Sequence, residues 1–219
     1  MTEVLTEVAK NIPTLVWAGT VAFALWLFRA PLAKRLGDVA GVKVVGIELS
    51  FAASQLAGAA ADANRNNRVE STRHKRHVQV TRADRERVLR RAERCRPVLD
   101  GKRFLWIDDS VTNNRKEREL LEALCLKIEQ VQSSALAEKA LADGGYDLIL
   151  SDISRPESVT AGLDFLATYR QRPAEQRLPL IYYISVRDED QPLPVGAFGL
   201  TNRPDTLVHL IIDALERTD

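Results

Sequence analysis

Short apolar runs alternate with helical patterns from residue 102 to residue 219, and this alternation restricts the possible folds more than any other feature. Three runs, RFLWI, DLILS and LPLIYYIS, are apolar at nearly every position, so both faces of each strand should be buried. Weaker strand patterns lie near 129–132 and 197–200, and helices are expected over 115–128, 135–142, 163–169 and 206–216. The pattern predicts an α/β fold with a doubly wound, five-stranded parallel sheet.

Polar residues follow the ends of these strands. Because ligands bind at the carboxyl ends of strands in such sheets, the candidate site contains Asp108, Asp109, Asp152, Ser185 and Arg203. Three converging carboxylates repel one another, and a hard divalent cation removes that repulsion. Mg²⁺ prefers oxygen ligands and keeps waters that a phosphoryl group can replace. A hydroxyl and a guanidinium would bind that group, so the residues predict a metal-assisted phosphoryl or similar anion site.

At this point the chain, from about 102 to 219, resembles the receiver (CheY-like) domain of two-component response regulators. The resemblance is carried by WIDDS, DLILSDISRP, Gly162, YYISVR and GAFGLTNRP. It implies a flavodoxin-like fold, with Asp152 as phosphoacceptor and Mg²⁺ as cofactor. The implied metal ligands are Asp108, Asp109, Asp152 and the backbone carbonyl of Ser154.

The same resemblance assigns the remaining site residues. Ser185 takes the Thr/Ser switch position, and Arg203 stands where the family has lysine before Pro204. That X–Pro bond is usually cis in the family, so a cis Arg203–Pro204 bond is expected. Leu200 occupies the position where the family often has a switch aromatic. Only ten residues, two of them proline, separate Ser185 from Gly196, which predicts a shortened or lost fourth helix and a changed output face.

Residues 36–101 are expected to form a small connector between an N-terminal segment and this domain. The alternation over 42–51 predicts a short strand or hairpin, and the alanine-rich run 52–63 predicts a helix. A second, basic helix should begin at Thr81, whose side chain can form a capping box with Asp84, and should stop at Pro97.

The stretch Asn11–Phe28 contains no charged residue. Its 18 residues are just long enough to cross a hydrocarbon core of about 30 Å. Acidic residues precede the stretch, whereas Arg29, Lys34 and Arg35 follow it, so the positive-inside rule places the C-terminal side in the cytoplasm. Residues 1–35 are therefore predicted to be a single-pass anchor in a bacterial inner membrane, with the N-terminus outside. A buried helix and a cleaved signal peptide are the alternatives.

Charge is unevenly distributed although the chain carries a net charge of only +1. Residues 65–103 carry a net charge of +9 and residues 104–219 carry −8. The basic connector could face anionic lipid or the acidic domain itself, and the absence of interleaved aromatics disfavours nucleic acid. Cys95 and Cys125 belong to no metal-binding or disulfide pattern.

These observations lead to one main hypothesis and two alternatives. The main hypothesis is a membrane-anchored, receiver-like signalling protein of a two-component-type phosphorelay. It would accept a phosphoryl group from a histidine kinase or phosphotransfer protein, act on an unidentified downstream protein, and perform no chemistry beyond its own phosphorylation and dephosphorylation. The first alternative is a pseudo-receiver scaffold without phosphotransfer. The second is a phosphohydrolase, which would need an acid where Ser154 stands.

Overall fold

The computed structural model describes residues 48–65, 80–110, 112–185 and 192–218. The chain divides into two units, Met1–Ile47 and Glu48–Asp219, and every described residue belongs to the second. The predicted membrane span, Asn11–Phe28, lies outside the described residues. Within the described ranges no helix is both long and apolar enough to cross a membrane.

Five parallel strands form the central sheet in the order β2-β1-β3-β4-β5. Their bounds are Arg103–Ile107 (β1), Lys127–Val131 (β2), Leu148–Ser151 (β3), Leu180–Tyr183 (β4) and Gly199–Thr201 (β5). This is the flavodoxin-like, doubly wound order also found in CheY. The predicted five-stranded, doubly wound sheet is therefore confirmed.

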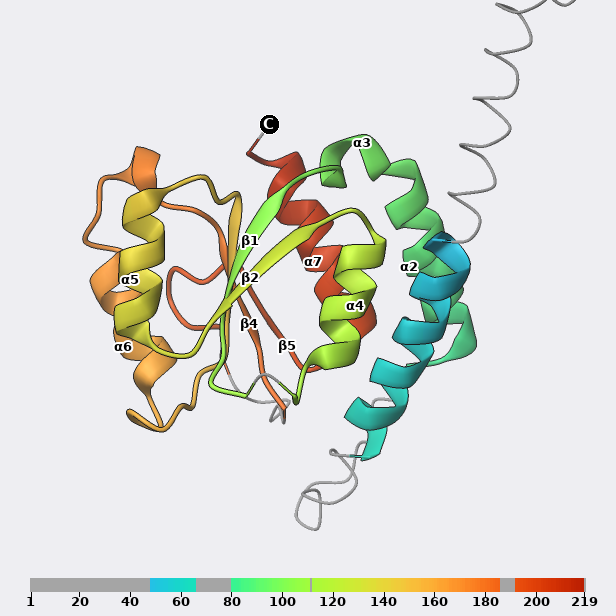
Figure 1. Cartoon of the computed structure of the whole chain (residues 1–219), viewed down its shortest axis with the longest axis horizontal. Helices are drawn as coiled ribbons and strands as arrows, with labels where there is room; N and C mark the ends of the chain where they lie inside the picture. The colour runs from blue at the N-terminus through green and yellow to red at the C-terminus, as the bar shows by residue number, and fades with distance from the viewer. Residues whose placement is uncertain (1–47, 66–79, 111, 186–191, 219) are drawn as a thin grey trace, which may run out of the picture. The chain divides into compact units, whose positions relative to one another are not determined.

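Helices cover both faces of the sheet because side chains alternate along each strand (Figure 1). Phe104 and Trp106 pack toward one face, where α4 (Arg115–Ala123) and α7 (Pro204–Glu216) lie. Leu105 and Ile107 pack toward the other face, against α5 (Ser134–Asp143) and α6 (Ala161–Tyr169). All four of these β1 side chains are at most 1% exposed, as expected for a strand buried on both faces.

Three further helices pack outside α4 and α7. Residues 48–65 are helical, and α2 (Arg82–Arg94) packs on α7, with the short α3 (Arg96–Leu99) following it. Their apolar faces join the core on the α4 and α7 side of the sheet. The predicted capping box of α2 is present, with Thr81 and Asp84 bonding reciprocally. Arg91 of α2 contacts Asp213 of α7 at 2.5 Å, so part of the connector's positive charge is neutralised by the acidic domain.

Three local predictions are wrong. The strand expected over 42–51 is helical from residue 48, because Ala52, Leu56 and Ala59 bury one helical face while Phe51 is 48% exposed; residues 42–47 lie outside the described residues. The basic helix expected to run up to Pro97 ends earlier, at Arg94, and Pro97 lies in the first turn of the separate helix α3, where proline is tolerated.

The third concerns the Arg203–Pro204 bond, which is trans. Pro204 is the first residue of α7, and Arg203 before it is extended, with φ −110° and ψ 123°. A trans proline suits this position because the first helical N–H has no partner in any case. Between β4 and β5, the described residues 184–185 and 192–198 contain no helix, and residues 186–191 lie outside the described part of the chain.

Candidate functional site

Asp108 and Asp152 lie side by side at the carboxyl edge of the sheet. Ile107 at the end of β1 pairs with Ser151 at the end of β3, and one acid follows each of them. The backbone N–H of Asp152 continues the ladder by donating to the carbonyl of Ile107 at 3.0 Å. Since neighbouring strands are about 4.8 Å apart, the parallel pairing brings the two acids together as the sequence predicted.

The Asp108 carboxylate is buried, with 3% of the residue exposed, and local donors hold it in place. Its Oδ1 accepts a hydrogen bond from the backbone N–H of Ser110 at 2.7 Å, and Oδ2 accepts one from the side-chain amide of Asn114. Burial raises the pKa of Asp108, and the neighbouring charge of Asp109 raises it further. Asp108 is therefore a positioned, incompletely compensated acid.

Asp152 is the most strongly perturbed acid of the site. Burial, followed by the charges of Asp108 and Asp109, raises its pKa to about 6. One carboxylate oxygen accepts a hydrogen bond from the backbone N–H of Ile153 at 2.7 Å, which opposes the rise. Asp108 and Asp109 therefore act on Asp152 electrostatically, because like charges disfavour its ionised form.

The donor set fits Mg²⁺ in its chemistry, because the predicted ligands Asp108, Asp109, Asp152 and Ser154 offer oxygen atoms only. Within the described ranges, no group of three or more His, Cys, Asp or Glu side chains is gathered closely enough to hold a metal ion. Mg²⁺ usually keeps several waters and takes only one or two carboxylates, so a looser pair still suits it. The metal site stays a prediction.

Gly162 determines how closely α6 approaches the candidate phosphoacceptor. A Cβ atom at this position would lie 2.3 Å from the carbonyl oxygen of Asp152 and 2.8 Å from Cα of Ile153. The backbone N–H of Gly162 donates to the Ile153 carbonyl at 2.8 Å, and the Tyr182 hydroxyl donates to the Gly162 carbonyl at 2.8 Å. Only glycine allows this contact without moving the loop that carries Asp152.

Ser185 and Arg203 are placed differently from the acids. Ser185 is exposed, two residues beyond the end of β4. The Arg203 guanidinium forms a two-point contact with Asp205, at 3.1 Å and 2.7 Å, and lies 3.6 Å from Asp84 of α2. Arg203 thus pairs with two carboxylates outside the acid cluster, whereas the sequence predicts that it binds the phosphoryl group.

Sequence reasoning missed a buried Glu117–Tyr183 pair. The Tyr183 hydroxyl donates to the Glu117 carboxylate at 2.8 Å and so links the end of β4 to α4. Burial raises the pKa of both groups. A signal was available, because Glu117 lies three residues before Leu120 and four before Leu121, on the apolar stripe of α4.

Arg155, in the loop after β3, was also missed. Its side chain is fully buried, and one guanidinium N–H donates to the carbonyl of Asp152 at 3.4 Å. No periodic pattern in a loop predicts such burial, so the sequence carried no signal for it.

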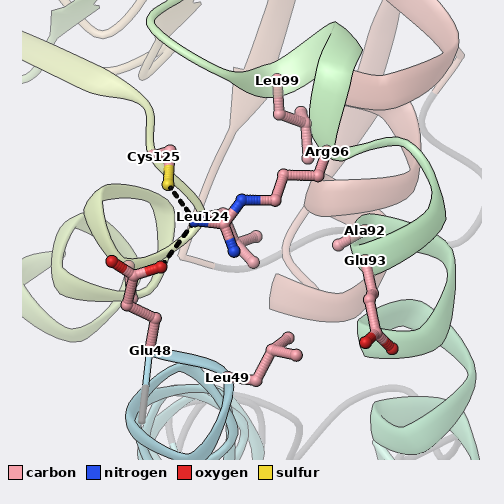
Figure 2. Close-up of a pocket in the computed structure, with 9 residues that line it drawn as sticks. Glu48, Leu49, Ala92, Glu93, Arg96, Leu99, Leu124 and Cys125 are labelled. Atoms are coloured by element: carbon pink, nitrogen blue, oxygen red, sulfur yellow. Dashed lines mark hydrogen bonds and ion pairs between the residues drawn. The ribbon is translucent and has the colours of Figure 1, made fainter. Parts of the chain in front are cut away.

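A pocket lies away from the acid cluster, between the 48–65 helix, the α2–α3 region and the turn between α4 and β2. Figure 2 shows the Arg96 guanidinium reaching from α3 to Glu48, at 2.7 Å, and to the sulfur of Cys125, at 3.3 Å. The remaining lining is largely apolar. Arg96 therefore links the start of the 48–65 helix to the turn between α4 and β2, and none of the residues that line the pocket belongs to the acid cluster.

Comparisons with known proteins found similar sequences and similar solved structures. No family model matches the sequence. The chain is 28% identical over 124 residues to a gliding motility regulatory protein of Myxococcus xanthus, and the match covers 55% of this chain and 16% of that protein. The chain therefore spans about a sixth of the length of that curated relative.

Similar solved structures include two CheY-like proteins. The chemotaxis response regulator CheY4 of Vibrio cholerae is 20% identical, with a TM-score of 0.45, and the match covers 52% of this chain and 98% of that one. A CheY-like receiver domain from Methylobacillus flagellatus is 21% identical, with a TM-score of 0.45, and the match covers 53% and 99%. The assignment of a receiver-like fold rests on the strand order of the sheet itself.

Proposed function

We propose that residues 102–219 form a receiver-like signalling module that accepts a phosphoryl group on Asp152 and acts through protein–protein contacts. The observation that carries this proposal is the position of Asp108 and Asp152 directly after the paired ends of β1 and β3, where burial, followed by the charges of Asp108 and Asp109, raises the pKa of Asp152 to about 6. A structural role alone gives no reason to place three mutually repelling carboxylates at the ligand-binding edge of a doubly wound sheet.

The reaction requires little from the protein beyond positioning. A carboxylate oxygen of Asp152 attacks the phosphorus of the donor, the bond from phosphorus to the donor's leaving group breaks, and the leaving group departs with the electron pair. Asp108, Asp109, Asp152 and the Ser154 carbonyl would hold Mg²⁺, which neutralises charge on the phosphoryl oxygens when bound. Local hydrogen bonds already hold the Asp108 and Asp152 carboxylates in place.

The setting of the reaction follows from the rest of the chain. The span Asn11–Phe28 would anchor the module to a bacterial inner membrane, with residues 102–219 in the cytoplasm. A histidine kinase or phosphotransfer protein would supply the phosphoryl group, and the basic connector would lie near anionic lipid. The similarity to a gliding motility regulatory protein and to response regulators supports a role in signalling.

One observation favours the alternative of a pseudo-receiver scaffold without phosphotransfer. Arg203 is held by Asp205 and Asp84, so the cation expected to bind the phosphoryl group already has partners. On this interpretation the acid cluster is a vestige, and the protein acts through constitutive contacts.

The experiment treats the purified full chain with acetyl phosphate and Mg²⁺ and maps the modified residue by mass spectrometry. The proposal expects one phosphoryl group on Asp152, no modification without Mg²⁺, and none in Asp152→Asn. Asp143→Asn, which changes an exposed carboxylate at the end of α5, should be labelled like the wild type. Failure of the wild type to accept a phosphoryl group or to bind beryllofluoride with Mg²⁺ would leave only the scaffold.

A further inference from the structure

Arg155 is a fully buried arginine in the loop between β3 and α6, three residues after Asp152. Its side chain is 0% exposed. The backbone around it forms a tight turn in which Arg155 and Ser158 exchange two hydrogen bonds, at 3.1 Å and 3.0 Å. The turn directs the guanidinium inward, toward the end of β3 and the start of α5.

The guanidinium ties together two segments that are distant in sequence. One terminal nitrogen donates to the Ser151 hydroxyl at 3.1 Å and to the Asp152 carbonyl at 3.4 Å. The other donates to the hydroxyl of Ser134, the first residue of α5, at 2.8 Å. The Asp152 carbonyl also accepts a hydrogen bond from the Ser151 hydroxyl at 2.8 Å, so Arg155 links an already bonded end of β3 to the start of α5.

The positive charge of this group is only partly balanced nearby. The Arg155 Nε atom is buried and has no hydrogen-bond partner in the described part of the chain. It lies 3.5 Å from the carboxylate of Glu157, whose side chain is 37% exposed and which also accepts hydrogen bonds from Ser134. Burying a charge is costly, and an apolar side chain of similar volume would fill the same space without that cost.

The field of Arg155 reaches the acid cluster. Its positive charge is among the influences that lower the pKa of Asp108, against the larger effect of burial. Arg203, the cation that the sequence assigned to this site, pairs instead with Asp205. Through its hydrogen bonds to Ser151, Asp152 and Ser134, Arg155 thus places a buried positive charge at the start of the loop that carries Asp152, which an apolar residue could not do.

We propose that Arg155 is a positioning residue for Asp152 and the fixed positive charge of the acid site. Its guanidinium holds the Asp152 carbonyl while its charge favours an anionic phosphoryl group and opposes a bound cation. The inference rests on the proposed function of Asp152 and adds a residue to it. Because the two ions carry opposite charges, loss of the Arg155 charge must change their affinities in opposite directions, whereas loss of a purely structural contact weakens both.

The test measures two affinities of the full chain by titration calorimetry, first for Mg²⁺ alone and then for beryllofluoride at saturating Mg²⁺. Arg155→Met is expected to bind Mg²⁺ more tightly and beryllofluoride more weakly, each by about tenfold, the effect of a nearby unit charge in a medium of effective dielectric about 20. Arg155→Lys keeps the charge and should restore most of the beryllofluoride affinity. The matched control is Arg172→Met, which removes a guanidinium that follows α6 and pairs with Glu138 of α5.

Glu157→Gln keeps the test decisive if Arg155→Met does not fold. It removes the carboxylate nearest to Arg155 and leaves the guanidinium in place, so Mg²⁺ should bind more weakly and beryllofluoride more tightly. The electrostatic role of Arg155 is wrong if Arg155→Met binds both Mg²⁺ and beryllofluoride more weakly. It is also wrong if Arg155→Met and Glu157→Gln both bind the two ions with wild-type affinity. In either case the proposed function stands. If the wild type binds neither ion, the proposed function and this inference fail together.

Discussion

Replacing Asp152 by asparagine should stabilise the folded chain at neutral pH. In the folded state burial, followed by the charges of Asp108 and Asp109, raises the pKa of Asp152 from 3.8 to about 6. The folded state therefore binds more protons than the unfolded state between these two values. Over that interval the free energy of unfolding falls as the pH rises, and above about pH 6 the whole penalty is present. Asparagine carries no charge and avoids the penalty.

The size of the effect follows from the shift. About two pKa units correspond to about 3 kcal/mol if the carboxylate were fully shielded from solvent. Asp152 is only partly buried, so solvent screening reduces this to about 1–2 kcal/mol. For a domain of this size that corresponds to a rise of about 2–8 °C in the unfolding temperature.

The assay is urea denaturation of the full chain without Mg²⁺, at about pH 4 and about pH 7.5. Asp152→Asn should match the wild type at the lower pH and exceed it at the higher one. Asp100→Asn, which changes an exposed carboxylate in the turn before β1, should not show this dependence on pH. If Asp152→Asn gives the same difference at both pH values, or lowers stability at neutral pH, the argument from ionisation is refuted.

Two further predictions concern packing. In Gly162→Ala the new Cβ would meet the Asp152 carbonyl at 2.3 Å, so we expect a loss of about 1–3 kcal/mol in thermal unfolding and weaker beryllofluoride binding. Gly101→Ala is a control for binding only: its Cβ meets no atom within 4 Å, but the φ of +74° strains alanine there and lowers stability as well. It should leave beryllofluoride binding unchanged, and equal binding by both variants would contradict the argument. Arg91→Met removes the ion pairs between α2 and two acids of α7, which should cost about 1–2 kcal/mol and speed hydrogen exchange in α2. The exposed Arg94→Met is its control, and equal exchange rates in the two variants would refute this role of Arg91.

The sheet was predictable from the sequence because its strands β1, β3 and β4 are buried on both faces along almost their whole length. Such strands read as unbroken apolar runs, and the strand β3, Leu148–Ser151, coincides with one of them. The pattern over 42–51 was ambiguous, because a few alternating residues next to an alanine-rich run also fit one helical face. Residues 48–51 are helical, because Ala52 and Leu56 of the same helix bury one helical face against the core.

The acids of the site were predictable for the same reason that the strands were. A carboxylate directly after a buried parallel strand must lie at the carboxyl edge of the sheet, so the pattern of strands is enough to place Asp108 and Asp152 there. Arg155 could not be placed in this way, because its burial depends on a turn closed by Ser158 and on a contact with α5. Neither leaves a periodic trace in the sequence.

Arg203 shows where reasoning from the sequence reaches its physical limit. Its position after β5 places a cation at the correct edge of the sheet, and that much follows from topology. Which anion the guanidinium binds depends on competition among the carboxylates within reach. The Arg203 guanidinium pairs with Asp205 because Asp205 is two residues away and its two carboxylate oxygens accept two hydrogen bonds from it. The second partner, Asp84, lies on α2, a helix outside the sheet that packs on α7. A phosphoryl group on Asp152 would have to outcompete both, so strand ends predict which residues surround a site but not how their charges pair.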